Sequence, residues 1–297
     1  MADKNERMKI EESELILTSE GKIYHLNLAP SELAPTVITV GDPDRVQMVS
    51  KHFDTIETTA QHREFNTHTG TYKGKRISVI STGIGPDNID IVFNELDALI
   101  NIDFEKRQVK KKLSSLDIIR IGTSGGLTPE IDVDTFLIST LGIGLDNVMH
   151  YYDKTDKIFN RDFAKAFIDH TQWNPDNSVP YVVEADKTLL KKFASEKTSS
   201  GITITNVGFY GPQGRVLRAK LKDANLNEKL KSFRYKKKKI TNLEMETATM
   251  YGMAKLLGHR AISMNAIIAN RATGSFSKDA SKTIEALIQY TLGKITE

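Results

Sequence analysis

Six stretches of the chain are near-continuous runs of apolar and β-branched residues, and most of them end in glycine or a small polar residue. Such runs are typical of strands that are buried on both faces, because helices cover the sheet. The runs span residues 36–41, 76–85, 116–126, 134–144, 201–211 and 261–271.

The segments between these runs place apolar residues at helical spacing. Alternating strands and helices predict an α/β fold with a mostly parallel or mixed sheet. We find neither an internal repeat nor a long linker, so we expect a single domain over residues 1–297. The expected helices span residues 44–52, 88–101, 187–198, 243–257 and 281–292.

Composition narrows the class of protein. Hydrophobic residues make up 39% of the 297 residues and charged residues 27%, as in soluble globular proteins. The net charge of +3 is too small for this length to indicate nucleic-acid binding. With no cysteine, disulfides, thiolate metal sites and thiol nucleophiles are excluded. The charged first ten residues do not resemble a signal peptide and no apolar run could span a bilayer, so we expect a cytoplasmic protein without membrane contact.

Two charged stretches, residues 103–113 and 233–239, need a separate interpretation. The second has five basic residues among seven, which raises the alternative of a non-catalytic nucleotide or nucleic-acid binding protein. No interleaved aromatic and basic residues extend that patch, so a solvated loop or helix flank is the favoured interpretation.

Polar residues that follow the predicted strands are the candidates for a site, because ligands gather at the carboxyl ends of strands in open α/β sheets. Gly41 permits a close backbone approach, and Arg45 lies in the first turn of a predicted helix, where an acid or a bound anion is expected. Arg120 lies inside an apolar run and is followed by the hydroxyls of Thr123 and Ser124. These groups suit a phosphate, although Arg120 paired with an internal acid and Arg45 on the surface remain alternatives.

Known catalytic motifs are missing from the chain. The glycine-rich stretch at residues 81–88 has neither the Lys-Ser/Thr of a P-loop nor the third glycine of a dinucleotide motif, which weakens kinases and dehydrogenases. There is no H-E-x-x-H zinc motif and no G-x-S-x-G nucleophile elbow.

Two further segments carry candidate chemistry. In "FYGPQGR", Phe209 could stack on a planar ring while Gln213 and Arg215 bond its edge, with an exposed glycine-proline turn as the alternative. In "TNLEMETATM", two carboxylates, Glu244 and Glu246, flank a methionine before a helix. Thr241 and Glu244 also fit a capping box, so these acids could be structural.

In this order the segments resemble the nucleoside phosphorylase-I family, and within it the uridine phosphorylase branch most. The resemblance covers residues 23–292 and leaves residues 1–22 as an N-terminal extension. It implies a three-layer α/β/α sandwich around a mixed, partly barrel-like sheet. It is carried by "HLNL", "VGDPDRV", "HREFNTHTGTYKGKRISVISTGIG", "IRIGTSGGL", "FYGPQGR", "LEMETATM" and "IIANR".

The resemblance implies the following roles. Phosphate would be held by Gly41, Arg45, Arg120, Thr123 and, in the neighbouring subunit's site, Arg63. Ribose would be bound by Glu244, Met245 and Glu246 and, across the subunits, by His25. The base would be held by Phe209, Gln213, Arg215 and Arg271. A monovalent cation such as K⁺ lies between subunits in some members, at positions that match Glu64, Ile84 and Asn88. The catalytic group would comprise Arg120, Gln213, Arg215 and Glu246.

Departures from the family pattern modify these expectations. Asn88 replaces the serine of the cation site, and the insertion at 103–113 and "GPQGR" alter the surroundings of the base pocket. The purine-cleaving branch carries a Ser-Asp pair where this chain has Asn270 and Arg271, which favours a pyrimidine. The implied reaction is the reversible phosphorolysis of uridine, with phosphate as co-substrate, no external cofactor, and a homodimer or hexamer as the assembly. Purine nucleoside phosphorylases and nucleosidases of the same superfamily are the alternatives.

Overall fold

The computed structural model describes residues 8–297, so residues 1–7 of the expected N-terminal extension lie outside the described part. Eleven strands of that part form one mixed sheet. They are β1 (Thr36–Val40), β2 (Thr55–His62), β3 (Phe65–Tyr72), β4 (Lys75–Ser81), β7 (Asp117–Gly126), β8 (Phe136–Gly144), β9 (Tyr181–Glu184), β10 (Thr198–Thr205), β13 (Asn242–Glu244), β14 (Arg260–Asn270) and β15 (Ser275–Phe276).

Five of these strands close into a ring. Its order is β14–β8–β10–β13–β7, and β7 pairs again with β14. β7 is parallel to β14 and β1, whereas β13 meets β7 in antiparallel orientation. On its other side β7 continues into the open part of the sheet through β1, β4, β3 and β2. The prediction of a mixed, partly barrel-like sheet is therefore confirmed.

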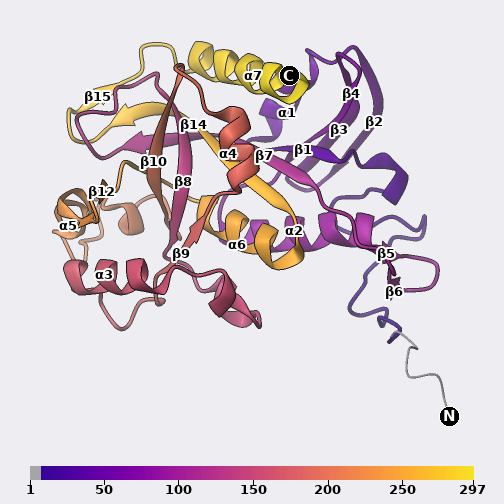
Figure 1. Ribbon diagram of the computed structural model, residues 1–297, viewed down its shortest axis with the longest axis horizontal. Helices are drawn as coiled ribbons and strands as arrows, with labels where there is room; N and C mark the ends of the chain where they lie inside the picture. Colours follow the sequence, from indigo (N-terminus) through magenta and orange to yellow (C-terminus); the bar gives the residue numbers. More distant parts are fainter. Residues whose placement is uncertain (1–7) are drawn as a thin grey trace.

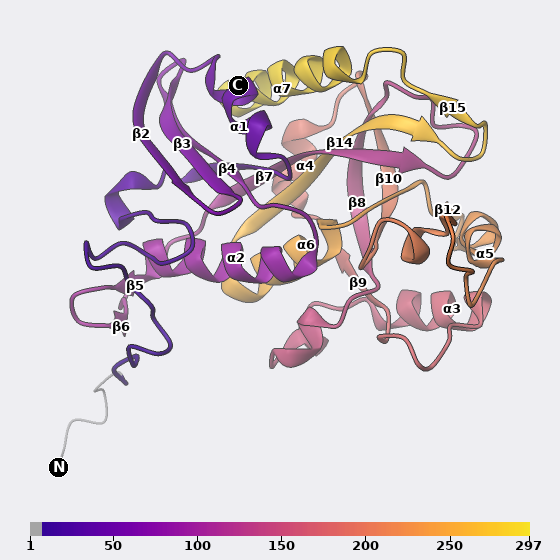
Figure 2. The same cartoon turned by 180° about the vertical axis from the view of Figure 1, so that it is seen from behind.

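Helices cover the sheet on both faces, which gives the three layers that the resemblance implied (Figures 1 and 2). Side chains of α1, α4 and α7 pack with those of β1, β7 and β14 in one core, and α2 and α6 share a second core on the opposite face. The helices are α1 (Pro43–Ser50), α2 (Pro86–Asn101), α3 (Arg161–Thr171), α4 (Lys187–Phe193), α5 (Leu226–Ser232), α6 (Thr247–Leu257) and α7 (Ala280–Thr296).

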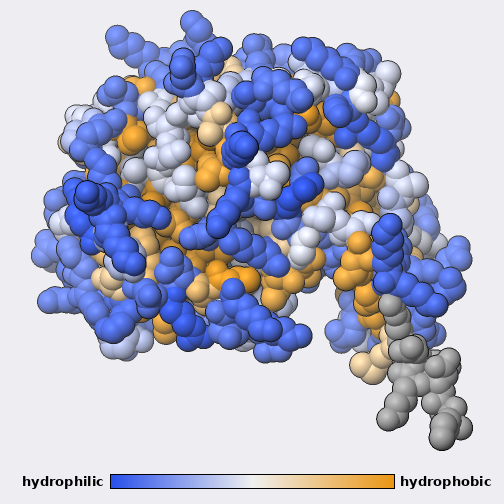
Figure 3. Space-filling model, viewed as in Figure 1, coloured by the Kyte–Doolittle hydropathy of each residue, from blue (hydrophilic) through white to orange (hydrophobic). Residues whose placement is uncertain are grey.

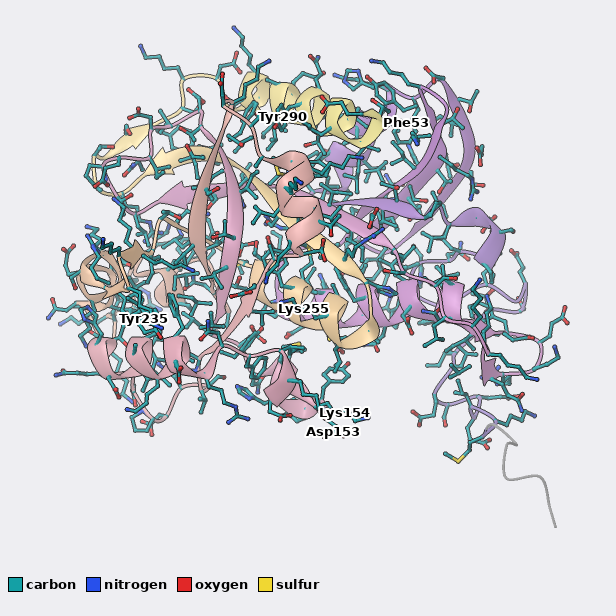
Figure 4. The ribbon with its side chains drawn as sticks, in the orientation of Figure 1. Phe53, Asp153, Lys154, Tyr235, Lys255 and Tyr290 are labelled. Atoms are coloured by element: carbon teal, nitrogen blue, oxygen red, sulfur yellow. The ribbon has the colours of Figure 1, made fainter. Side chains whose placement is uncertain are left out.

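The near-continuous apolar pattern of the central strands follows from this double cover. In β7, Ile118 faces the α2–α6 core, whereas Ile119 and Ile121 face the core under α7. Figure 4 shows Tyr290 of α7 and Lys255 of α6 on opposite sides of the sheet. The Tyr290 hydroxyl donates to the carbonyl of Phe193 at 2.6 Å, which ties α7 to the end of α4. No helix within residues 8–297 is long and apolar enough to cross a membrane.

Element boundaries differ from the predicted ones where a polar segment carries no periodicity. The helix predicted from residue 243 begins only at Thr247, because residues 242–244 are drawn into the ring as β13. The run at 201–211 leaves the sheet after Thr205, and a short 3-10 turn at Gly211–Gln213 follows. The hairpin of β2 and β3 and the helices α3 and α5 were not predicted.

The two charged stretches both form small hairpins. Residues 102–109 make β5 (Ile102–Asp103) and β6 (Gln108–Val109), and residues 234–239 make β11 (Arg234–Tyr235) and β12 (Lys238–Lys239). Between β5 and β6, Arg107 donates to the carbonyls of Ile10, Glu11 and Leu15. This contact joins the described part of the N-terminal extension to the hairpin, and Figure 3 shows the resulting lobe separated from the main body by a hollow.

Candidate active site

A cavity of about 700 Å³ opens where β1, β7, β13 and β14 end. The helices α1 and α6 begin at its wall, so their dipoles favour negative charge there. Most residues that the sequence singled out line this one cavity. They are Gly41, Arg45, Glu64, Ile84, Asn88, Arg120, Thr123, Phe209, Gln213, Arg215, Glu244, Met245 and Glu246.

Arg120 reaches the cavity from within the ring, and its side chain is buried. Its Nη2 atom donates to Glu246 at 2.5 Å and lies 3.1 Å from Glu244. Burial lowers the pKa of Arg120, but the charges of the two carboxylates outweigh it and leave that pKa raised. The alternative weighed from the sequence, an arginine paired with internal acids, is thus present at the very cavity in which the anion site was expected.

Gly122 provides the space for this arginine. A Cβ atom on Gly122 would lie 1.9 Å from Nη1 of Arg120, closer than any two such atoms approach. The Arg120 side chain therefore lies along β7 with its guanidinium over position 122, and only a glycine at that position permits this.

Glu244 and Glu246 have different surroundings. The Glu244 carboxylate accepts from Thr205 Oγ1 and from the backbone N–H groups of Glu246 and Thr247, in addition to Arg120. Burial raises the pKa of Glu244, and the charge of Arg120 opposes that rise. Protein donors therefore take the hydrogen-bond acceptor capacity of the Glu244 carboxylate, which caps the start of α6.

Glu246 has acceptor capacity left. Its Oε2 binds Arg120, and its Oε1 accepts from the N–H of Gly85 at 2.9 Å, the residue before α2. A carboxylate can accept about four hydrogen bonds, so Glu246 can still bind a ligand. The predicted capping box is wrong in its register. Thr241 donates to Ile202 and Asn242 inside the ring, and Glu246, not Thr241, is the residue that precedes α6.

Arg45 lies in the first turn of α1, as predicted, and its side chain donates from Nη1 to the carbonyl of Ile121 at 3.3 Å. Burial lowers the pKa of Arg45, and the nearby charge of Arg120 lowers it further. Two guanidinium groups at one cavity, Arg120 buried and Arg45 half-buried, are suited to bind an anion. Gly41 and Thr123 line the wall beside them.

The opposite end of the cavity carries the groups suited to a planar ring. The Arg215 guanidinium lies 3.7 Å from the centre of the Phe209 ring, and its Nη1 donates to Gln213 Oε1 at 2.5 Å. Arg271 does not line the cavity; it donates to the backbone carbonyl of Gln213. Burial and the charge of Arg215 lower the pKa of Arg271 to about 10. Arg271 thus holds the glutamine rather than facing the cavity.

Two predicted residues lie away from this chain's own cavity. His25 donates its backbone N–H to Glu95 at 3.0 Å, and its Nδ1 lies 2.6 Å from the same carboxylate. Arg63 is exposed at the turn between β2 and β3 with a left-handed φ of 54°, a conformation that is strained for a residue with a side chain. The resemblance assigned both to a neighbouring subunit's site, so their position outside this cavity agrees with that expectation without testing it.

The candidate cation ligands meet at one point of the wall. A Cβ on Gly83 would lie 2.4 Å from the Asn88 amide and 3.0 Å from the Glu64 side chain, so both side chains pack over Gly83. A carboxylate and an amide are oxygen donors of the kind that hard cations prefer, so the residues present fit such an ion. Within residues 8–297 no group of three or more His, Asp or Glu side chains is arranged to hold a metal.

Some lining residues were missed by the sequence reasoning. Phe276 of β15 and Ile268 of β14 form apolar wall near the base-binding groups, and Leu243 lies where β7 meets β13. Ser124, which the sequence offered with Thr123 as a hydroxyl suited to phosphate, also lines the cavity. Nothing in the local pattern marks Phe276, because it reaches the cavity through a pairing of β15 with β14 that only the fold reveals.

Comparison with known proteins agrees with this geometry. A family model described as the phosphorylase superfamily matches residues 35–292. A uridine phosphorylase from Thermococcus kodakarensis is 31% identical over 275 residues, which cover 89% of this chain and 83% of that protein. A DeoD-type purine nucleoside phosphorylase from Listeria welshimeri is 27% identical over 251 residues, covering 84% of this chain and 88% of that protein.

Among solved structures, a nucleoside phosphorylase from Trypanosoma brucei that shows uridine phosphorylase activity superposes with a TM-score of 0.82. The two chains are 28% identical, and the alignment covers 95% of this chain and 99% of the trypanosomal one.

Proposed function

This chain belongs to the phosphorylase superfamily, and from that premise we propose that it converts uridine and phosphate reversibly to uracil and ribose 1-phosphate. One observation carries the proposal: a single cavity holds a pair of arginines, a carboxylate with spare acceptor capacity, and a glutamine–arginine pair beside an aromatic ring. These match an anion, a sugar and a polar planar base in that order. The enzyme is thus a pentosyltransferase.

Phosphate would bind between Arg45 and Arg120, with the hydroxyl of Thr123 and the backbone at Gly41 completing its shell. Charge-assisted bonds to these groups bind the dianion and aim one oxygen at the anomeric carbon of the sugar. The guanidinium groups supply position and charge, and phosphate itself is the nucleophile. A variant Arg120→Ala should therefore lose phosphate-dependent turnover.

Ribose would bind at Glu246, whose remaining lone pairs accept hydrogen bonds from the sugar hydroxyls. As the glycosidic bond breaks, positive charge develops on the sugar ring, and a fixed carboxylate beside it stabilises that charge. The thioether of Met245, at the same wall, would pack on the apolar face of the sugar. Glu244 would hold this wall in place through its bonds to Arg120 and the start of α6, and would not touch the sugar.

The departing base takes up negative charge. Gln213 offers both a donor and an acceptor to the uracil edge, and Arg215 can donate to a carbonyl oxygen on which the charge collects. Phe209 provides an apolar face for the ring. A variant Gln213→Ala should impair uridine turnover more than it impairs phosphate binding, because the amide faces the base end of the cavity.

A homodimer is the minimal assembly of this proposal, and a hexamer is a further possibility consistent with it. His25 and Arg63 would complete the partner's site, His25 at the ribose and Arg63 at the phosphate. A monovalent cation would be held by Glu64, Asn88 and the backbone at Ile84. Light scattering of the purified protein measures the assembly. Turnover of the variant Arg63→Ala, compared with that of the wild type, tests the link between assembly and catalysis.

A spectrophotometric assay of uridine cleavage, with and without phosphate and with inosine alongside, tests the function. We expect loss of uridine only when phosphate is present, and little loss of inosine. Cleavage of inosine in preference to uridine would refute the pyrimidine assignment, and cleavage without phosphate would identify a nucleosidase. Salt-sensitive binding to polyanions without turnover would indicate a nucleic-acid binding protein and not an enzyme.

A further inference from the structure

Polar side chains form a continuous hydrogen-bonded chain through the interior of the five-strand ring. Asn265 Nδ2 donates to Ser139 Oγ at 2.9 Å, and Ser139 Oγ lies 2.5 Å from Thr203 Oγ1. Thr203 Oγ1 donates to Asn242 Oδ1 at 2.9 Å, and Asn242 Nδ2 donates to Ser124 Oγ at 2.6 Å. Each of β14, β8, β10, β13 and β7 contributes one member.

Burying this hydrogen-bonded network costs folding free energy, so we looked for a role that would account for it. Asn265, Ser139, Thr203 and Asn242 are all fully buried, in a place where apolar side chains would fill the ring without desolvating polar groups. A buried polar network is stable only if its members are satisfied, and then it fixes one arrangement of the side chains in it. The question is which side chain needs to be fixed.

Arg120 lies at one end of this hydrogen-bonded network. Its Nη1 donates to Asn265 Oδ1 at 3.0 Å and, more weakly, to Ser263 at 3.4 Å. An arginine has only donors, so the oxygen of Asn265 must face it, and the amide nitrogen must then face Ser139. Because the hydroxyl of Thr203 donates to Asn242, the hydroxyl of Ser139 donates to Thr203. Asn265 lies opposite Gly122 in the pairing of β14 with β7, where the folded-back guanidinium lies.

The other end of the hydrogen-bonded network, at Ser124, also reaches the cavity. Ser124 Oγ donates to the carbonyl of Leu243 at 3.0 Å, and both residues line the cavity wall next to Glu244. The network thus runs from the proposed phosphate arginine, through the ring, to β13, which carries Glu244.

We propose that Asn265 is a positioning residue for phosphate binding. By holding Nη1, it keeps the Arg120 guanidinium in the orientation in which Nη2 faces the Glu244 and Glu246 carboxylates at the cavity wall, and prevents it from turning into the ring. This inference rests on the proposed role of Arg120 in the phosphorylase reaction. Asn265 itself does not line the cavity and touches neither substrate.

The test compares two variants with a matched control. Asn265→Asp keeps the shape but places a carboxylate 3.0 Å from Nη1, where it competes with phosphate for the guanidinium. Asn265→Leu keeps most of the volume and removes the acceptor. In the control, Ser139→Ala, Asn265 Nδ2 loses one acceptor but Oδ1 still holds Arg120, and Ser263 Oγ at 3.3 Å remains for the amide.

We expect both Asn265 variants to raise KM for phosphate at least about 10-fold, in line with a lost or diverted charge-assisted bond. KM for uridine should change by no more than about 2-fold, and Ser139→Ala should leave KM for phosphate unchanged. The rise in Tm that phosphate alone causes should shrink in the Asn265 variants, a readout that needs no turnover.

The opposite results are as clear. Unchanged KM for phosphate in both Asn265 variants would overturn the proposal, and so would an equal rise of both KM values, since that is what a merely structural role predicts. If Asn265→Asp does not fold, Asn265→Leu decides alone. If the wild-type protein does not cleave uridine, the proposed function fails, but the Tm comparison with phosphate still tests the link between Asn265 and anion binding.

Discussion

The two carboxylates beside Met245 should separate into a structural acid and a substrate-binding acid. We consider the isosteric variants Glu244→Gln and Glu246→Gln. In Glu244→Gln the amide nitrogen replaces an oxygen that now accepts two or three protein donors, whichever way the amide turns. Buried donors are then left facing a donor, and Arg120 loses one of its two counter-charges.

The cost can be estimated from this geometry. Breaking one side of a buried ion pair costs about 3–5 kcal/mol. The entropy of unfolding of 297 residues is about 0.6 kcal/mol/K, so Glu244→Gln should lower Tm by about 5–8 °C. Glu246→Gln also breaks a buried ion pair with Arg120, but it leaves fewer protein donors unmatched, because the Gly85 N–H can still reach the remaining oxygen. That variant should be destabilised less, by about 3 kcal/mol.

Catalysis should show the reverse order. A hydrogen bond from a sugar hydroxyl to a charged acceptor contributes about 1.5–3 kcal/mol, which corresponds to about 10- to 150-fold in kcat/KM. We expect that loss for Glu246→Gln with uridine, and a smaller loss with 2′-deoxyuridine, which lacks one of the hydroxyls. For Glu244→Gln any loss should be the same with both nucleosides.

The assay measures kcat/KM for both nucleosides at 25 °C, well below the Tm of each variant, after circular dichroism has shown that each is folded. Comparable substrate-dependent losses in both variants would refute the division of roles. A larger loss in Glu244→Gln than in Glu246→Gln, confined to uridine, would reverse the assignment and place Glu244 at the sugar.

Of three further predictions, two concern the surroundings of the site and one concerns Asp146, a buried carboxyl that accepts from Tyr181 and Thr249. Gly122→Ala should displace the Arg120 guanidinium, since a Cβ would lie 1.9 Å from Nη1, and should lower kcat/KM for phosphate at least about 10-fold; phosphate titrations of this variant check it. Arg271→Met should raise KM for uridine while KM for phosphate stays within about 2-fold, because the backbone of Gln213 loses its donor; steady-state kinetics with each substrate varied checks it. Burial raises the pKa of Asp146, so the charged form is disfavoured in the folded protein and stability falls as pH rises from the ordinary pKa of about 4 through the raised one. Urea unfolding over that range should show the wild-type protein losing free energy relative to Asp146→Asn, and parallel profiles would contradict the cause given for the shift.

The sequence predicts the central strands well because their apolar runs are long and both faces are buried. It fails where a segment's state depends on a distant partner. Residues 242–244 read as the start of a helix, yet they are a strand because β10 and β7 lie on either side of them. The helices α3 and α5 are missed as well, although their buried side chains share a core with those of β8 and β10.

For the site, the sequence brought together the right residue types but not their mutual contacts. Arg120 was recognised as a charge inside an apolar run, and the same reasoning applied to Asn265, a polar residue inside the run at 261–271, would have found the second member of the ring network. That Glu244 caps α6 while Glu246 keeps free lone pairs depends on where the helix begins, which the sequence places four residues too early.

The closure of the ring also has a consequence for how the protein is made. β7 pairs along its length with β14, and the first residues of the two strands, Asp117 and Arg260, are 143 positions apart. At about 5–20 residues per second, a ribosome needs about 7–30 s to deliver the second strand after the first. Until then β7 presents an apolar edge with unpaired backbone groups, the kind of surface on which other chains add strands. Nascent chains that terminate before residue 260 should therefore aggregate or engage chaperones, whereas chains stopped after β14 should not.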